Sequence, residues 1–203
     1  MFAWALTALA IALVATGLTT TADAAPAVPN VHRWLLTLSE MPVGWGHATN
    51  PAAGPGKCST INDVAAQHPG ASGTASFSEG NTLETDELFE LIAGWPSRSV
   101  ARNAFQRITA AVSRCNGYTI SSSGGTYPVM FKRINLGTYG VKTQSYQALT
   151  SLGPIDVIDS FALVLKGRAV LAVHYIIITP SSSALSLAAG LKLIKKAVAK
   201  VPG

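Results

Sequence analysis

The chain has 203 residues, of which 48% are hydrophobic and only 12% charged, and its formal net charge is +5. This length suits one domain with its own hydrophobic core, and the composition excludes an intrinsically disordered chain. The basic balance favours contact with anionic surfaces such as phospholipid headgroups or acidic wall polymers. The sequence has no basic run interleaved with aromatic residues, so we expect no nucleic-acid partner.

The first residues have the pattern of a secretory signal peptide. Residues 2–18 are mostly Ala, Leu, Val and Ile and contain no charged side chain, and Ala22-Asp23-Ala24 follows as a cleavage site of small residues. We therefore predict a signal peptide over 1–24 and a single secreted or extracytoplasmic domain over 25–203. The alternative is an uncleaved membrane anchor, because about 17 apolar residues approach the length that spans a bilayer. We expect membrane contact only through the leader, if it stays uncleaved.

Cys58 and Cys115 are the only two cysteines, and in an oxidising compartment they are expected to form a disulfide bond. A zinc site would need two further ligands, and the four histidines show no ligand spacing with the cysteines. We therefore predict one disulfide, no metal site and no cofactor.

The N-terminal half alternates helix, loop and strand signals. Residues 32–39 predict a short helix, and the Gly- and Pro-rich residues 46–57 predict a loop. Residues 72–79 and 83–93 predict two strands, although the acidic residues of the second fit an exposed helix almost as well. The clearest helix begins after the N-cap Ser97 and runs to about Arg114, with a continuous apolar stripe.

The C-terminal half predicts mostly strands, followed by a final helix that ends near Lys200. A short strand precedes the turn at 121–125, and further strands are expected over 127–135, 140–150, 156–165 and 168–179. The last strand is apolar on both alternating faces, so it should lie in the centre of its sheet.

No motif for catalysis or phosphate binding is present, including G-x-S-x-G, H-E-x-x-H and the P-loop. The best remaining triad would combine a serine with His174 and Asp159 or Asp156. His174 lies within an apolar strand, where a neutral core or groove histidine is more common than a general base. We therefore expect no enzyme, and a hydrolase that uses His174 is the least favoured alternative.

Several segments together resemble an actinobacterial family of exported sensor domains, which includes the extracellular domain of PknH-type kinases and related lipoproteins. The resemblance rests on LLTLSEMPVGW (35–45), WPSRSVARNAFQRITAAVSRC (95–115), the cysteine between them, and the late hairpin with its C-terminal helix. It implies an α+β domain in which a twisted antiparallel sheet, here of about 5–7 strands, is packed by two main helices around a cleft.

The resemblance and the missing catalytic motifs together predict an exported, non-catalytic ligand-binding or sensor-like domain of the cell envelope. Its ligand would be small and amphiphilic or anionic, bound in a cleft beside the sheet. The alternative is an envelope module that binds other proteins through its surface. Trp45, Trp95 and His174 are the candidate residues for contact with a ligand or partner.

Overall fold

The computed structural model describes residues 27–48, 58–81, 84–122, 125–181 and 186–203. The predicted signal peptide lies outside these residues, as does most of the loop predicted over 46–57. Within the described ranges, no helix is long and apolar enough to cross a membrane.

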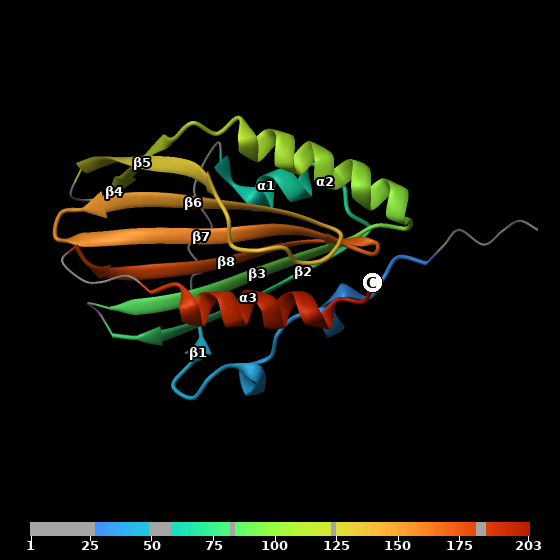
Figure 1. Ribbon diagram of the computed structural model, residues 1–203, viewed down its shortest axis with the longest axis horizontal. Coiled ribbons are helices and arrows are strands. Elements are labelled where there is room, and N and C mark those ends of the chain that lie inside the picture. The colour runs from blue at the N-terminus through green and yellow to red at the C-terminus, as the bar shows by residue number, and fades with distance from the viewer. Residues whose placement is uncertain (1–26, 49–57, 82–83, 123–124, 182–185) are drawn as a thin grey trace, which may run out of the picture.

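One antiparallel sheet of eight strands forms the centre of the molecule, in the order β1-β2-β3-β8-β7-β6-β5-β4 (Figure 1). The strands are β1 (Gly46–His47), β2 (Ala71–Gly80), β3 (Thr85–Gly94), β4 (Tyr118–Ser122), β5 (Gly125–Ile134), β6 (Lys142–Leu152), β7 (Ile155–Lys166) and β8 (Ala169–Pro180). The helices are α1 (Thr60–Ala65), α2 (Arg98–Ser113) and α3 (Ala188–Lys200). Two short 3₁₀ helices, η1 (Val31–Trp34) and η2 (Leu38–Glu40), precede them.

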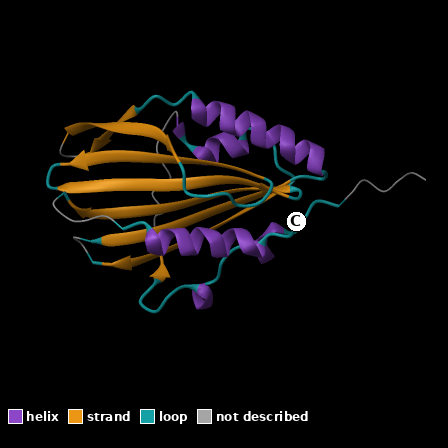
Figure 2. Cartoon of the chain, viewed as in Figure 1, coloured by secondary structure: helices purple, strands orange, loops and turns teal. Residues whose placement is uncertain are grey.

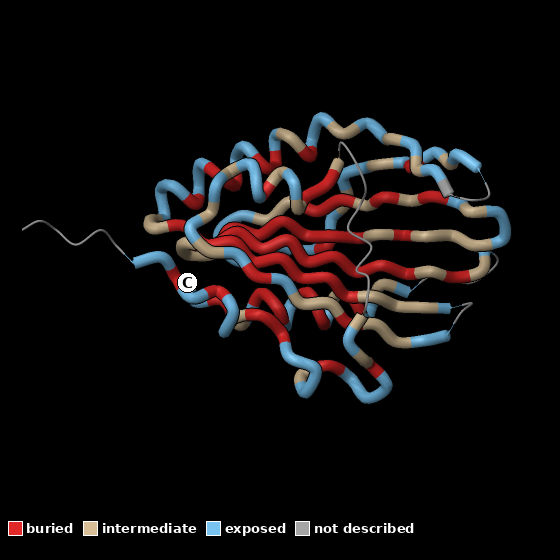
Figure 3. Tube along the Cα trace, turned by 180° about the vertical axis from the view of Figure 1, so that it is seen from behind, coloured by how far each residue is buried: buried red, intermediate tan, exposed pale blue. Residues whose placement is uncertain are grey.

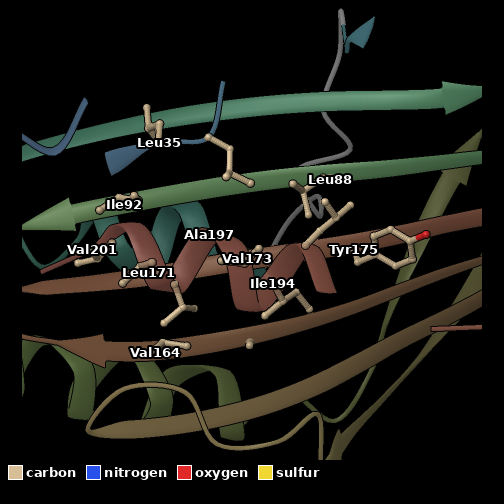
Figure 4. Packing of buried hydrophobic residues seen from close by; sticks show 14 of the residues in the cluster. Leu35, Leu88, Ile92, Val164, Leu171, Val173, Tyr175, Ile194, Ala197 and Val201 are labelled. Atoms are coloured by element: carbon tan, nitrogen blue, oxygen red, sulfur yellow. The ribbon is translucent and has the colours of Figure 1, made fainter. Parts of the chain in front are cut away.

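The sheet is covered on both faces (Figure 2). Helices α1 and α2 pack on one face, which we call the α2 face, and α3 packs with the N-terminal segment on the other, which we call the α3 face. Strand β8 contributes buried side chains to both faces. Ala172 belongs to the core of the α2 face, and its neighbour Val173 belongs to that of the α3 face (Figure 4). Its central position between β3 and β7 confirms the prediction from its apolar sequence.

Helix α2 also forms as predicted. The Ser97 hydroxyl accepts a hydrogen bond from the Val100 N–H at 3.3 Å, which satisfies one of the free donors at the helix start. The apolar stripe is buried against the sheet and consists of Ala101, Ala104, Phe105, Ile108 and Val112. Residues 85–94 form strand β3, so the strand interpretation of this acidic segment is confirmed over the helical one.

Two predictions need correction. The sheet has eight strands rather than 5–7, because Gly46 and His47, which were expected to lie in a loop, pair with Ser78 and Phe77 of β2. The helix predicted over 32–39 is replaced by η1 and η2. The chain is extended between them at Leu35 and Thr37. The Leu36 N–H is bound by a side chain from the sheet rather than by a helical carbonyl.

Burial is uneven along the strands. Figure 3 shows that the strands are buried in the half of the sheet nearest the C-terminus and become less buried towards the opposite end. Helix α2 begins and helix α3 ends at the buried half (Figure 1).

Glu90 is fully buried on β3, between the core residues Leu88 and Ile92 of the α3 face. Its Oε2 accepts a hydrogen bond from the Leu36 N–H at 2.8 Å, and its Oε1 has no partner among the described residues. Burial raises the pKa of Glu90 to about 7, although the bond from Leu36 and the nearby Lys200 oppose this rise. Below about pH 7 the folded state therefore favours the protonated carboxyl of Glu90.

We expect Glu90 to make the protein less stable as the pH rises. Because its pKa in the folded state lies above the ordinary 4.5, the free energy of unfolding should fall as the pH rises from about 4.5 to about 7. The total change is about 3 kcal/mol, at about 1.4 kcal/mol per pKa unit. Glu90→Gln keeps the shape of the protonated group and should remove this slope, measured by urea unfolding at a series of pH values.

Glu40→Gln is the matched control. In the parent protein, the hydrogen bond from Lys200 lowers the pKa of Glu40 to about 2. The stability that the Glu40 carboxylate contributes is therefore present above pH 4.5 and is lost as the pH falls towards 2. This control should leave the slope between pH 4.5 and 7 unchanged. An equal slope in Glu90→Gln and the parent protein would show that Glu90 is already ionised in the folded state at acidic pH.

Candidate ligand site

The structure places the three predicted contact residues inside the protein. Trp45, Trp95 and His174 are 8%, 2% and 6% exposed. Trp45 belongs to the core of the α3 face and Trp95 to that of the α2 face, so the sheet separates the two tryptophans. The structure therefore does not bring the three residues together into one site.

The predicted disulfide is confirmed between Cys58 and Cys115, whose Cα atoms are 5.8 Å apart. Cys58 precedes α1, and Cys115 follows the last turn of α2, where its N–H donates to the Val112 carbonyl. The bond therefore joins the start of α1 to the end of α2 on the α2 face. This cross-link fixes the position of the residues that directly follow α2.

His174 lies in a buried polar chain that crosses from the sheet to α1. Its Nδ1 lies 2.8 Å from Asp159 Oδ2 on β7, and its Nε2 lies 2.9 Å from the Thr60 hydroxyl on α1. A neutral ring that carries its proton on Nδ1 satisfies both bonds, because Nδ1 then donates to Asp159 and Nε2 accepts from Thr60. The predicted pairing of His174 with Asp159 is therefore present, whereas Asp156 instead accepts hydrogen bonds from Ser151 and Ser181.

The His174 ring also ends a row of stacked aromatic rings on the α2 face. Phe131 of β5 stacks on Tyr146 of β6 with ring centroids 5.5 Å apart, and Tyr146 stacks on Phe161 of β7 at 5.4 Å. Phe161 then stacks on His174 of β8 at 4.5 Å. The row therefore runs from the core towards the β5 side of the sheet, where Phe131 is only half-buried.

A hollow of about 290 Å³ lies at the outer end of this row, and we call it the basic hollow. Its lining comes from the end of α2 and from strands β5 and β6: Ser113, Cys115, Asn116, Phe131, Lys132, Arg133 and Tyr146. Arg133 pairs directly with Tyr146 in the strand ladder, so both side chains project from the same face. Ser113 lies 2.9 Å from the Tyr146 hydroxyl, which fixes the tyrosine at the base of the hollow.

The charge in the basic hollow is not neutralised. Lys132 and Arg133 are exposed, and neither forms an ion pair within the described ranges. Arg133 projects from the same face of β5 as Phe131, so its free charge can bind an anionic group while an aromatic or apolar group contacts the ring. The side chain of Lys132 projects from the opposite face. The volume is close to the lower limit of typical small-molecule sites, which are about 300–1,000 Å³. The arrangement therefore suits a small anionic amphiphile.

A second hollow, of about 400 Å³, has the opposite charge. It is lined by Glu79, Glu84 and Asp86 at the ends of β2 and β3. The Tyr175 hydroxyl donates a hydrogen bond to Asp86 at 2.6 Å, and burial together with this carboxylate raises the pKa of Tyr175. This acidic groove would repel an anion, so an anionic ligand favours the basic hollow.

The fold defines the class of the protein as an α+β domain, in which one antiparallel sheet is covered by helices on both faces and one disulfide joins two of the helices. The crystal structure of the extracellular domain of PknH from Mycobacterium tuberculosis is similar to this structure. The two chains are 15% identical, with a TM-score of 0.58 over 86% of this chain and 97% of that chain. The sequence matches no protein-family model, and no curated protein matches it. At this identity the likeness establishes the fold.

The residues of the basic hollow were missed by the sequence analysis. Phe131 and Arg133 lie two positions apart in a predicted strand, so their alternation places them on one face. This pattern alone does not reveal Tyr146, because only the register between β5 and β6 brings it beside Arg133. The three residues could have been grouped only after the strand pairing was known.

Proposed function

We propose that the chain is an exported, non-catalytic domain of the cell envelope that binds a small anionic amphiphile in the basic hollow, as a sensor-like module. The observation that carries this proposal is the free cation Arg133 beside the aromatic row that begins at Phe131. The disulfide supports an extracytoplasmic location, because such bonds persist in oxidising compartments. Membership of the actinobacterial sensor-domain family, suggested by the sequence, is part of the same proposal.

The proposal can be tested with two dyes that share their aromatic rings. Anilinonaphthalene sulfonate carries an anionic group, and phenylnaphthylamine lacks it. Arg133→Gln should weaken binding of the sulfonate dye about tenfold, because it removes one charged hydrogen bond, and should leave binding of the neutral dye within about twofold. Phe131→Ala should weaken both. Fluorescence titration measures each dissociation constant.

Arg107→Gln is the control for this test, since Arg107 is an exposed arginine of α2 that forms no ion pair within the described ranges. It should bind both dyes like the parent protein. Equal weakening by Arg107→Gln and Arg133→Gln would mean that the dye responds to net charge rather than to the basic hollow. Unchanged binding in both Arg133→Gln and Phe131→Ala would place the ligand elsewhere.

The hydrolase alternative is favoured by one observation, the polar chain of Asp159, His174 and Thr60. The Thr60 residue is only 4% exposed, and none of the three residues lines the basic hollow or the acidic groove. This burial supports a structural role, in which the chain of hydrogen bonds attaches α1 to the sheet. The burial of Trp45 and Trp95 likewise gives no support to an interaction module that uses these side chains.

A further inference from the structure

One side of strand β2 is open along part of its length. Its inner side pairs with β3 from end to end, whereas on its outer side β1 pairs only with Ser78 and Phe77 among the described residues (Figure 1). The pairing ends at a hydrogen bond of 3.2 Å from the Ala48 N–H to the Ser76 carbonyl. We call the rest of this side, over residues 71–75, the open edge.

The main chain of the open edge presents donors and acceptors to solvent. The Ser76 carbonyl points outwards to Ala48. Alternate residues of a strand point the same way, so the N–H and C=O groups of Thr74 and Ser72 also point outwards. In the part of the chain that the structure describes, these groups have no hydrogen-bond partner, and both residues are exposed. The open edge can therefore pair with a further strand.

The open edge also lacks the features by which proteins protect such edges. Charged side chains and prolines commonly prevent a second chain from pairing with a free strand. Residues 71–75 (ASGTA) contain neither. An extended chain can therefore approach this side of β2 without meeting a charge or a proline ring.

A hollow of about 400 Å³ lies beside the open edge. Thr74 is among its lining residues although its side chain points to the α2 face with that of its partner Leu91, so the hollow reaches the main chain of the edge. Ala75 and Phe77 line the hollow from the α3 face. The hollow can therefore receive a side chain that an added strand directs to the α3 face.

Two segments form the walls of this hollow. One is the N-terminal segment, which is held at Leu36 by the hydrogen bond of 2.8 Å from its N–H to the buried Glu90. The other is β1, where the His47 ring lies against Phe77 with ring centroids 5.4 Å apart. Both walls are fixed by contacts with the folded core, so binding does not have to order them.

From these observations we infer that the open edge binds an extended peptide segment of a partner protein, which adds to the sheet as an antiparallel strand. The main chain of this peptide pairs with Thr74 and Ser72, and its alternate side chains point to the α3 face. One of them enters the hollow and is large and apolar, because Leu35, Leu36 and Phe77 line the space. The row of outward main-chain groups identifies the occupant, since an extended backbone matches their spacing.

This surface is separate from the basic hollow, which lies on the α2 face beside Phe131. The inference therefore does not depend on the small ligand proposed above. It gives the alternative of a protein-binding module a surface that uses neither Trp45 nor Trp95, since neither tryptophan lines the hollow beside the open edge.

The test uses a short capped peptide in which threonines and valines alternate around a central phenylalanine. With the phenylalanine in the hollow, its two neighbours direct their N–H groups to β2. N-methylation of these two neighbours should weaken binding at least about tenfold, because it removes both donors. The control peptide is N-methylated on the phenylalanine and on the next residue but one, whose N–H groups point away from β2. It should bind within about threefold of the unmodified peptide. Calorimetric titration measures each dissociation constant.

Thr74→Pro is the corresponding change in the protein. Proline removes the outward N–H and its ring blocks a further strand, but no bond to β3 is lost, because the Thr74 N–H points away from β3. This variant should bind the unmodified peptide at least about tenfold more weakly than the parent protein. Thr74→Ala keeps the N–H and should bind within about twofold of the parent protein. Circular dichroism should give the same spectrum for all three, and the two methylated peptides remain decisive if the proline variant does not fold.

Hydrogen exchange followed by NMR tests the same edge directly. In the free protein the Thr74 amide should exchange faster than that of Ala75, whose N–H faces β3, and the peptide should slow it. Equally slow exchange of both amides in the free protein would overturn the inference, because another segment would already cover the edge. Equal binding of the two methylated peptides would also overturn it, since apolar contact alone would then explain binding. Self-association that Thr74→Pro abolishes, without binding of the peptide, would assign the edge to a second copy of the chain instead.

Discussion

Replacing Trp95 with alanine should lower the free energy of unfolding by about 3–5 kcal/mol, the usual cost of removing a large buried aromatic side chain. Trp95 is only 2% exposed, lies between β3 and α2, and packs in the core of the α2 face. Its indole N–H also donates to the Gln67 carbonyl at 3.3 Å, which would lose its partner. Urea unfolding followed by circular dichroism measures the change.

Trp95→Phe serves as the control, because it keeps most of the buried volume and loses only the indole N–H. It should therefore be clearly more stable than the alanine variant. If Trp95→Ala left stability unchanged but abolished binding to envelope extracts, Trp95 would be a contact residue, as the sequence first suggested, and its packing role would be wrong.

Removal of the disulfide should have an effect of similar size. The bond between Cys58 and Cys115 closes a loop with a sequence separation of 57 residues. On the chain-entropy model such a cross-link stabilises the folded state by about 4 kcal/mol, since it restricts the unfolded chain. We expect the double variant Cys58→Ser with Cys115→Ser to lose this amount in urea unfolding and to weaken dye binding, because Cys115 lines the basic hollow.

Reduction provides the control for this prediction. A thiol reductant should shift the unfolding midpoint of the parent protein to that of the double variant and should not change the variant itself. Two midpoints that stayed apart after full reduction would mean that the serine side chains, rather than the missing cross-link, destabilise the variant.

The sequence predicted those elements whose formation depends only on residues close together in the chain. The α2 stripe needs only helical spacing, and the central place of β8 follows from apolar residues on both of its faces. The helix expected over 32–39 was wrong because a distant residue decides the local conformation: Glu90 binds the Leu36 N–H from β3. Strand β1 was missed because two residues carry no alternation, and only the partner strand β2 defines it.

The candidate site was harder to predict than the fold. Trp45 and Trp95 were chosen as candidate contact residues because they are tryptophans. Residue type alone does not distinguish a core tryptophan from a surface one. The basic hollow depends on which strands are neighbours, because Arg133 and Tyr146 are opposite each other only through the β5–β6 register. The sequence offered Asp159 and Asp156 as alternative partners of His174, and only the structure shows that Asp159 is the one bound to the ring.

The position of β8 between β3 and β7 also governs the order in which the chain can fold. Strands β1 to β3 and strands β4 to β7 form two groups of neighbours along the sequence, and β8 joins these groups only after almost the whole chain is available. Contacts between such distant segments form slowly, because a long loop must be closed first. With this topology the centre of the sheet is completed only when the C-terminal part of the chain is present.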